Sequence, residues 1–472
     1  MINSGSLIII CHGVFIVRNI LLLLLIFVVS CTTIDDTYYQ PNSPDIPQPS
    51  VNTYPDDDYA KRKNVIKKYP PPKQLDEKSK GVFTRFASFP PVKVALLVPL
   101  SGKYQELGKN MLDSAQLALF GINEPNLILV PIDTKGTSYG AVEAVEKAIE
   151  NDVNIILGPI FSKSAQAVAD KAKQNGISVV SFSNDKTLAD KGIFAMGFRP
   201  EQQIRRVVEF AMEKGMEDFA AVLPNNAYGA AAAKEMRNSV AANKEASVLK
   251  TEIFITDKSG EPKRLKSHVY AAFDSLMNTK PPKDYNEELK KFNDNPIKFP
   301  RALLVPQGGE NLSMVSELLT NYKHDPEKIK LLGTSNWYQD EEALLSNPVL
   351  QGSWFATPPK DRREIFESKF REIYGYEPNE LASLAYDGIA LTATIARITK
   401  GQDFSNRSLT NPRGFVGIDG IFRFKENGLT ERGLAIIEIW DGKFYIVSPA
   451  PQNFFEIERF EEDSADDSSS DY

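Results

Sequence analysis

The residues of this chain that could do chemistry are mainly hydroxyls and carboxylates, because histidine and cysteine are scarce. The 472-residue sequence holds three histidines and two cysteines. Cys11 and His12 stand near the N-terminus, which leaves Cys31, His268 and His324 for the rest of the chain. These are too few for a Cys/His metal centre or an internal disulfide bond. We therefore expect no metal site and no cofactor.

The sequence patterns of common nucleotide and zinc-protease sites do not occur. GxGxxG after a strand, GxxxxGK[ST] and HExxH are missing from the sequence, and each supplies groups that its chemistry requires. Carboxylates are plentiful, so a glycosidase-type pair is not excluded by counting, but no pattern supports one. We expect the chain not to be an enzyme.

The stretch Val92–Leu119 combines hydroxyls with a strong structural pattern. Val94–Val98 is a continuous apolar run, typical of a parallel strand covered on both faces. Apolar residues at helical spacing follow from Gly108. Ligands of open α/β sheets bind beside the loops at the carboxyl ends of strands, so Ser101 and Tyr104 in the loop are candidate ligand-binding residues. Alternatively, Ser101 belongs to a plain turn and Tyr104 covers a helix end.

Length and composition set wider bounds. A chain of 472 residues with 42% hydrophobic content can form two or three domains with large cores. The formal net charge of −7 and a pI near 5.4 give no support for nucleic-acid binding.

The N-terminus predicts export and a lipid anchor. Arg18 precedes the apolar run Ile20–Val29, which has the length of a signal-peptide core. The residues Val28-Val29-Ser30-Cys31 resemble the bacterial lipobox, so residues 1–30 are interpreted as a lipoprotein signal peptide and Cys31 as the lipidated first residue. An ordinary secretory signal or an uncleaved anchor is the alternative.

Polar segments flank the predicted folded region. Residues 31–91 are rich in Pro, Asp, Asn and Lys and are expected to be a disordered tether. About 60 flexible residues give an r.m.s. reach of roughly 40 to 50 Å. Residues 456–472 form an acidic, Ser-rich tail that we also expect to be disordered.

Between these segments, apolar strands alternate with helices. This alternation begins at Val92 and resumes after Pro200, with a polar insertion at residues 279–300. It predicts an α/β fold with doubly wound parallel sheets in two lobes. Three further strands are expected at Gly420–Phe424, Leu434–Trp440 and Phe444–Val447, separated by Asn-Gly and Asp-Gly turns.

Several segments resemble the leucine-binding type (type I) of bacterial periplasmic binding protein. They are VALLVPLSG, IILGPIFSKSAQAV, ISVVSFSND, VLPNNAYGAAAAKEM and FREIYGYEPNELASLAYDGIAL. The segments FPRALLVPQGGE, LLGTSNWYQDEEAL and LQGSWFATPP most resemble the penicillin-binding protein activator lipoproteins. The resemblance implies two lobes with a cleft and three inter-lobe crossovers, near Pro200, near Gly352 and before the C-terminal strands. It assigns residues 92–200 and 352–405 to the N-lobe and residues 201–351 and 406–455 to the C-lobe.

The resemblance to amino-acid-binding relatives also implies ligand residues. Positions that hold a ligand carboxylate in those proteins correspond to Ser162, Ser164, Ser181 and Ser183, and an aromatic clamp corresponds to Tyr228. Lys163 and Phe182 depart from the small, neutral residues usual there, and Thr334–Trp337 occupies the place of the acidic partner for an amino group. Plain helix N-capping is the alternative role for Ser162 and Ser164.

Two functions follow from these resemblances. The first is a periplasmic lipoprotein on the outer (or inner) membrane of a Gram-negative bacterium that regulates a peptidoglycan-synthesising penicillin-binding protein without catalysis. The second is a solute-binding protein that delivers an amino acid or similar small molecule to an ABC transporter permease. The partners expected are thus one of these two proteins, the membrane through the lipid anchor and a small molecule in the cleft, but no nucleic acid.

Overall fold

The computed structural model describes residues 51–52, 90–257, 261–278, 301–322, 324–326, 328–401 and 403–455. The predicted signal peptide, Cys31, the acidic tail and the insertion at residues 279–300 lie outside the described residues. Within the predicted tether, Val51–Asn52 is described as a short strand, β1, parallel to Phe444–Tyr445.

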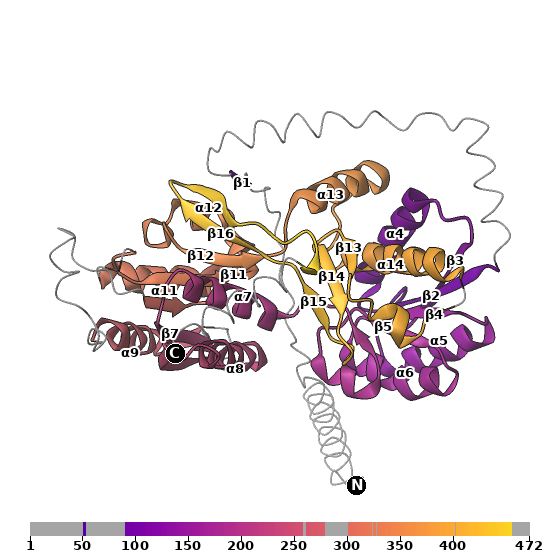
Figure 1. Cartoon of the computed structure of the whole chain (residues 1–472), viewed down its shortest axis with the longest axis horizontal. Coiled ribbons are helices and arrows are strands. Elements are labelled where there is room, and N and C mark those ends of the chain that lie inside the picture. The colour runs from indigo at the N-terminus through magenta and orange to yellow at the C-terminus, as the bar shows by residue number, and fades with distance from the viewer. Residues whose placement is uncertain are drawn as a thin grey trace, which may run out of the picture. The chain divides into compact units, whose positions relative to one another are not determined.

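The first lobe is built on a five-stranded parallel sheet in the order β3-β2-β4-β5-β6 (Figure 1). The side chains of β2 alternate between two cores. Val94 and Leu96 enter the cluster that includes helices α4 and α14, whereas Ala95 and Leu97 enter the cluster under α5 and α6. The continuous apolar run therefore reflects burial on both faces, as predicted. Its elements are β2 Val92–Val98, α4 Gln105–Ile122, β3 Leu127–Asp133, α5 Ser138–Glu150, β4 Ile155–Leu157, α6 Ser162–Gln174, β5 Ser178–Ser181, η1 Lys186–Lys191 and β6 Phe194–Ala195.

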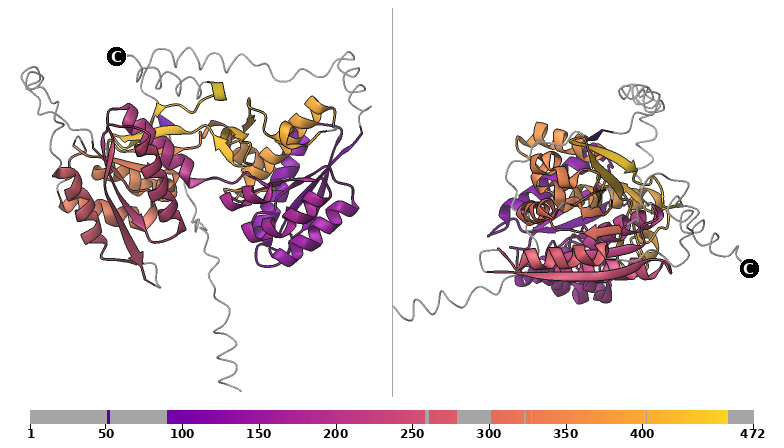
Figure 2. Two further views of the ribbon diagram at one scale, coloured as in Figure 1. Left: turned by 60° about the horizontal axis from the view of Figure 1, so that its bottom comes forward. Right: turned by 90° about the vertical axis from the view of Figure 1, so that its left-hand side faces the viewer.

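The second lobe is built on a nine-stranded mixed sheet in the order β1-β17-β16-β12-β11-β10-β7-β8-β9. Its central strands are parallel, and β16 joins antiparallel to β12. This sheet is also buried on both faces, because neighbouring residues of β7 enter different hydrophobic clusters: Val222 enters one and Ala221 enters the other. Helices flank the strands of each lobe in the views of Figure 2.

The second lobe is formed by two stretches of the chain, one that runs from α7 to β12 and one that contains β16 and β17. Its elements are α7 Pro200–Glu213, β7 Asp218–Pro224, α8 Ala227–Ala241, β8 Ser247–Thr256, β9 Pro262–Lys263, α9 Leu265–Met277, β10 Arg301–Leu304, α11 Gly309–Asn321, β11 Lys330–Thr334, η2 Ser335–Asp340, α12 Glu341–Ser346, η3 Pro348–Leu350, β12 Trp354–Thr357, β16 Ala435–Trp440 and β17 Lys443–Ser448.

A three-stranded antiparallel sheet, β13-β14-β15, packs with the first lobe. Phe422 and Phe424 belong to the first lobe's core, and the ring centroids of Phe424 and Phe194 are 5.1 Å apart. The elements between the second and third crossings are α13 Asp361–Tyr374, α14 Ala382–Thr399, α15 Asn406–Leu409, β13 Phe415–Gly417, β14 Gly420–Phe424 and β15 Thr430–Arg432.

Two lobe boundaries differ from those expected from the sequence. Strand β12 was assigned to the first lobe, but Leu332 pairs with Trp354, so β12 belongs to the second sheet. Residues 415–432 were assigned to the second lobe, but their aromatic side chains fill the first lobe's core. An apolar pattern predicts that a strand exists but does not say which sheet it joins, which explains both corrections.

A group of buried charges joins α13 and α14 to the loop between β13 and β14. Asp419 is fully buried, and its Oδ1 accepts a hydrogen bond from Arg363 Nε at 2.8 Å while its Oδ2 accepts one from Ser383 Oγ at 2.7 Å. Asp387 Oδ1 accepts a hydrogen bond from the Ile418 amide at 2.7 Å. Burial, followed by the charge of Asp419, raises the pKa of Asp387 to about 7. These contacts fix the small sheet to the helices of the first lobe.

Among the described residues, no helix is long and apolar enough to cross a membrane. The same part of the chain contains no group of three or more His, Cys, Asp or Glu side chains placed to hold a metal ion.

Candidate functional site

The loop after β2 is held by a carboxylate at the end of β3. Ser101 Oγ donates to Asp133 Oδ2 at 2.5 Å, and the Leu100 amide donates to Asp133 Oδ1 at 2.8 Å. The Lys135 amide donates to the same Oδ1 at 2.8 Å. The parallel pairing of β2 with β3 brings these two strand ends together. The Ser101 hydroxyl proton is therefore committed to shaping the loop.

The charge of Asp133 is stabilised by these donors. Burial on its own raises the pKa of Asp133, but the hydrogen bonds from Ser101 Oγ and from the amides of Lys135, Leu100 and Ser101 outweigh it and lower the pKa. The carboxylate is consequently ionised in the folded protein at neutral pH.

Tyr104 lies against the loop after β4. Its ring centroid is 4.6 Å from that of Phe161, with the rings tilted by 51°. Gly136 adopts φ of +67°, and a Cβ at this position would meet Tyr104 Cδ2 at 2.8 Å. Tyr104 is therefore half-buried between two loops. It is the N-cap residue of α4, but its side chain makes no capping hydrogen bond.

Ser162 and Ser164 lie in the first turn of α6. Neither is the N-cap of this helix: that residue is Phe161, which makes no side-chain capping bond. Ser164 is 2% exposed, and neither hydroxyl has a hydrogen-bond partner within the described part of the chain. The alternative role of N-capping for these two serines is therefore wrong. Because helix N-termini can bind anions, these two serines stay candidate ligand residues.

Ser181 and Ser183 are buried at the end of β5. Ser181 Oγ donates to the Pro159 carbonyl at 2.7 Å and accepts a hydrogen bond from the Ser183 amide at 3.2 Å. Ser183 Oγ accepts a hydrogen bond from the Asp185 amide at 3.2 Å. Both serines thus support the loop that follows β5, and Ser181 also ties it to the loop after β4.

Phe182 and Lys163, which depart from the small, neutral residues expected at these positions, differ in how exposed they are. Phe182 is 2% exposed and belongs to the core of the first lobe, so its bulk does not line a ligand site. Lys163 is exposed in the first turn of α6.

Tyr228 lies at the carboxyl end of the second sheet, in the first turn of α8. Its Oη donates to the Pro306 carbonyl at 2.9 Å and lies 3.1 Å from Thr334 Oγ1. The same carbonyl accepts hydrogen bonds from Thr334 Oγ1 at 2.9 Å and from Asn336 Nδ2 at 3.3 Å. The six candidates of the first lobe gather at one sheet edge, whereas these bonds of Tyr228 run within the second lobe.

Sequence reasoning missed two polar side chains beside this network. Gln307 is 6% exposed, and the nitrogen and oxygen of its amide group are buried with no hydrogen-bond partner among the described residues. Asn311, in the first turn of α11, has a buried Oδ1 that also lacks a partner. Such groups are costly unless something binds them. Gln307 stood within a segment used for the resemblance, but its lack of a partner could not be read from the sequence.

A second pattern was also missed. Residues Gly136–Gly140 read GTSYG, which matches the nucleophile pattern GxSxG between a strand and a helix. Ser138 is the first residue of α5, and the preceding Thr137 caps this helix by accepting the Gly140 amide at 3.0 Å. The two described histidines belong to the second lobe. His268 lies in the first turn of α9, and His324 lies in the loop after α11. No general base is thus identified for Ser138 among the described residues.

Perturbed charges also occur at the second crossing between the lobes. Lys360 Nζ lies 3.4 Å from the centroid of the Tyr338 ring. Burial lowers the pKa of Lys360 to about 8 and raises the pKa of Glu341 to about 7. The contact between Lys360 and Tyr338 holds the crossing segment against η2.

Comparison with known proteins supports the fold. Residues 91–259 match the family model for periplasmic binding proteins. An uncharacterized protein, RP748, of Rickettsia prowazekii (strain Madrid E) is 23% identical over 365 residues, which cover 76% of this chain and 89% of the relative.

Three solved structures with low sequence identity are also similar. A putative branched-chain amino acid ABC transporter protein from Rhodospirillum rubrum has a TM-score of 0.62 at 16% identity and covers 76% of this chain and 100% of its own. A branched-chain amino acid ABC transporter periplasmic ligand-binding protein from Burkholderia xenovorans LB400 has a TM-score of 0.56 at 16% identity, covering 76% and 94%. An ABC transporter substrate-binding protein from Sphaerobacter thermophilus has a TM-score of 0.56 at 16% identity, covering 77% and 98%.

The two lobes, their parallel sheets and these structural similarities show the fold of the periplasmic binding proteins. More particularly, the chain has the type I fold of the leucine-binding proteins, as the sequence resemblance predicted.

Proposed function

We propose that the chain is a non-catalytic, lipid-anchored periplasmic protein that activates a peptidoglycan-synthesising penicillin-binding protein, here called the synthase, by direct contact. The supporting observation is the state of the candidate ligand residues. The hydroxyl protons of Ser101, Ser181 and Tyr228 are donated to Asp133, Pro159 and Pro306. A hydroxyl has one proton to donate, and a ligand carboxylate needs donors. These three side chains are thus poorly disposed to hold an amino acid.

Two of the three segments that most resemble activator lipoproteins, FPRALLVPQGGE and LLGTSNWYQDEEAL, pack together. Trp337 Nε1 donates to the Val305 carbonyl at 2.8 Å. A Cβ at Gly308 would meet the Asn336 carbonyl oxygen at 1.7 Å, so only glycine fits at this close approach. These two segments therefore form one contiguous unit at the carboxyl edge of the second sheet.

The predicted tether gives this function a physical basis. A domain held on about 60 flexible residues samples partners at an effective concentration that its tether sets. A weak docking surface is then sufficient for regulation. Attachment through Cys31 keeps the domain at the membrane, and residues 31–91 provide the reach.

Shortening the tether tests this proposal. Deleting half of residues 32–91 is expected to impair synthase regulation in cells while leaving the protein's abundance and stability unchanged. The matched control replaces the deleted residues with a Gly/Ser segment of equal length, which should restore function because reach rather than sequence matters. Crosslinking in cells, followed by purification of the tethered protein, should recover the synthase. Full function of the short form together with no crosslink to a synthase would contradict the proposal.

A transport function is the second candidate, and a specific observation favours it. Among the described residues, no hydrogen-bond partner is found for the hydroxyls of Ser162 and Ser164 at the start of α6 or for the buried amide group of Gln307. These groups could together hold a small polar molecule at the carboxyl edges of the two sheets.

Calorimetry with a panel of amino acids separates the two candidates. A solute-binding protein should bind one of them at micromolar concentration, and Ser164→Ala should weaken binding. Tyr228→Ala should weaken it by about 1 to 3 kcal/mol, the range for a buried aromatic contact. Titrations without heat of binding favour the regulator.

A further inference from the structure

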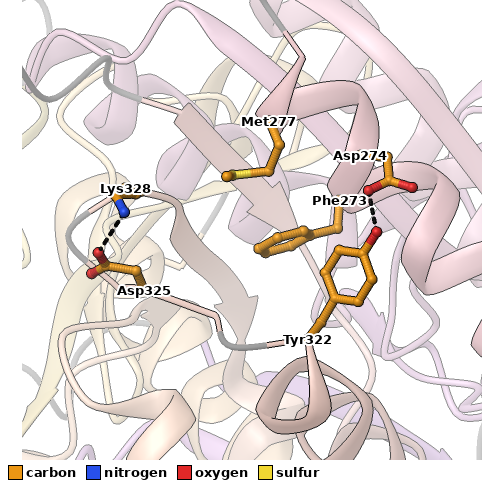
Figure 3. A pocket seen from close by; sticks show the side chains of 6 residues that line it. All are labelled: Phe273, Asp274, Met277, Tyr322, Asp325 and Lys328. Atoms are coloured by element: carbon orange, nitrogen blue, oxygen red, sulfur yellow. Dashed lines mark hydrogen bonds and ion pairs between the residues drawn. The ribbon is translucent and has the colours of Figure 1, made fainter.

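A recess lies between the C-terminal end of α9 and the loop that enters β11, away from the candidate residues. Its volume is about 190 Å³. Six side chains from both segments line it, as Figure 3 shows: Phe273, Asp274, Met277, Tyr322, Asp325 and Lys328. It is somewhat larger than the roughly 150 Å³ cavity that accepts benzene. A single side chain or small organic molecule therefore fits.

The apolar part of the recess is aromatic. The rings of Phe273 and Tyr322 are nearly perpendicular, with centroids 5.2 Å apart, and Tyr322 packs on Tyr270 at 4.3 Å. Phe273 is 4% exposed, whereas Met277 is 43% exposed and its thioether extends into the recess (Figure 3). The rings are thus fixed by packing, and the flexible methionine can adapt to an occupant.

The polar lining of the recess consists of Asp274, Asp325 and Lys328, together with the Tyr322 hydroxyl. Asp274 Oδ1 accepts a hydrogen bond from Tyr322 Oη, and within the described structure this is the one partner found for that carboxylate. The hydrogen bond, together with burial and the charge of Asp274, raises the pKa of Tyr322, so the phenol stays neutral. Asp325 lies across the recess, with Lys328 Nζ 3.3 Å from its Oδ2. Among the six lining residues there are thus two carboxylates and one lysine.

The surroundings also favour a cation. Asp274 and Met277 are in the last turn of α9, a helix of 13 residues, where the helix dipole attracts positive charge. Lys328 is 61% exposed, and its ion pair with Asp325 is a surface contact that contributes little to stability. A second cation can therefore approach without breaking a strong interaction.

We propose that this recess binds the guanidinium group of an arginine side chain presented by a partner protein. A planar guanidinium can stack on the more exposed Tyr322 ring and donate to the open oxygen of Asp274, which an ammonium does less well. The site lies at the amino end of β11, whereas Thr334, the partner of Tyr228, ends that strand. Docking here leaves the candidate ligand residues accessible, so the inference stands under either proposed function.

Methionine-methyl NMR of the full chain tests the proposal, because Met277 is one of eight methionines and lies in the recess. N-acetyl-arginine amide should shift the Met277 resonance, identified by its loss in Met277→Leu, in a saturable manner. N-acetyl-norvaline amide keeps the apolar stem but lacks the guanidinium and should bind at least about tenfold more weakly. N-acetyl-lysine amide should fall between them.

Variants connect the signal to the carboxylate. Asp274→Asn keeps an acceptor for Tyr322 but removes the charge, and should weaken arginine binding by at least about tenfold. Glu317→Gln changes the net charge equally at an exposed position on α11 and should leave binding unchanged. No shift at Met277, equal binding of the arginine and norvaline probes, or unchanged binding in Asp274→Asn would each overturn the proposal. Failure here would leave the tether and synthase tests unaffected.

Discussion

The phenolic oxygen of Tyr228 lies 3.1 Å from Thr334 Oγ1, and both groups bond the Pro306 carbonyl. The first turn of α8, the loop after β10 and the end of β11 thus meet through one aromatic side chain expected to clamp a ligand. We infer that Tyr228 contributes to the stability of the lobe.

Tyr228→Phe should lower the free energy of unfolding by about 1 kcal/mol, since it removes the partly buried hydrogen bonding of the hydroxyl and leaves the ring in place. Chemical denaturation of both proteins measures the difference. Tyr139→Phe is the control, because Tyr139 is 74% exposed, and it should change stability by less than about 0.5 kcal/mol. Equal stability of the Tyr228 variant and the native protein would show that this network contributes nothing.

Asp133→Asn should remove a pH-dependent part of the stability. The folded-state pKa of Asp133 is lowered against the opposing effect of burial, so its contribution is complete above the unfolded pKa of about 3.9 and is lost as pH falls through the folded value. The native protein should therefore be more stable than Asp133→Asn at pH 7, by about 1 to 3 kcal/mol for hydrogen bonds to a charged group. The difference should shrink below pH 4. A difference that does not change with pH would contradict the assignment.

Arg363→Met should destabilise the protein by about 3 to 5 kcal/mol, because it leaves Asp419 buried without its cation. Asp419 is fully buried and 2.7 Å from Arg363 Nη2. Glu377→Gln breaks the ion pair of Arg371 and Glu377, both largely exposed, and serves as the control with an expected cost below about 1 kcal/mol. Thermal unfolding of the two variants compares them, and similar costs would show that burial of the Arg363 pair has no special effect.

The sequence predicted the strands and the fold class more fully than it predicted the site. Val94–Val98 is apolar throughout, and such a run reports burial on both faces directly. The partners of Tyr228 are 78 and 106 residues away, and no local pattern encodes such a contact. The assignment of β12 failed for the same reason, since pairing with β11 is a property of the assembled sheet.

The serines show the same division between local and tertiary information. Their positions after apolar strands could be predicted. The hydrogen bond that Ser101 Oγ donates to Asp133, however, depends on how β2 and β3 align. The sequence also could not distinguish Ser162 from a capping residue, because the helix begins one residue earlier than a serine cap requires.

Cys31→Ser should release the protein from membranes, because two or more acyl chains bind a bilayer much more firmly than a polar tether does. Cell fractionation measures this, with Cys11→Ser as the matched control that should stay membrane-bound. Retention of the Cys31 variant at the membrane would contradict lipidation at this residue.

The rate of glycan synthesis by the purified synthase, measured with and without the mature protein lacking its lipid, tests the regulatory function most directly. Addition of the protein is expected to raise the rate in a saturable manner, with Tyr228→Phe as effective as the native protein and with no amino acid required. An unchanged rate at saturating protein, combined with calorimetric binding of an amino acid, would contradict the regulator and support transport.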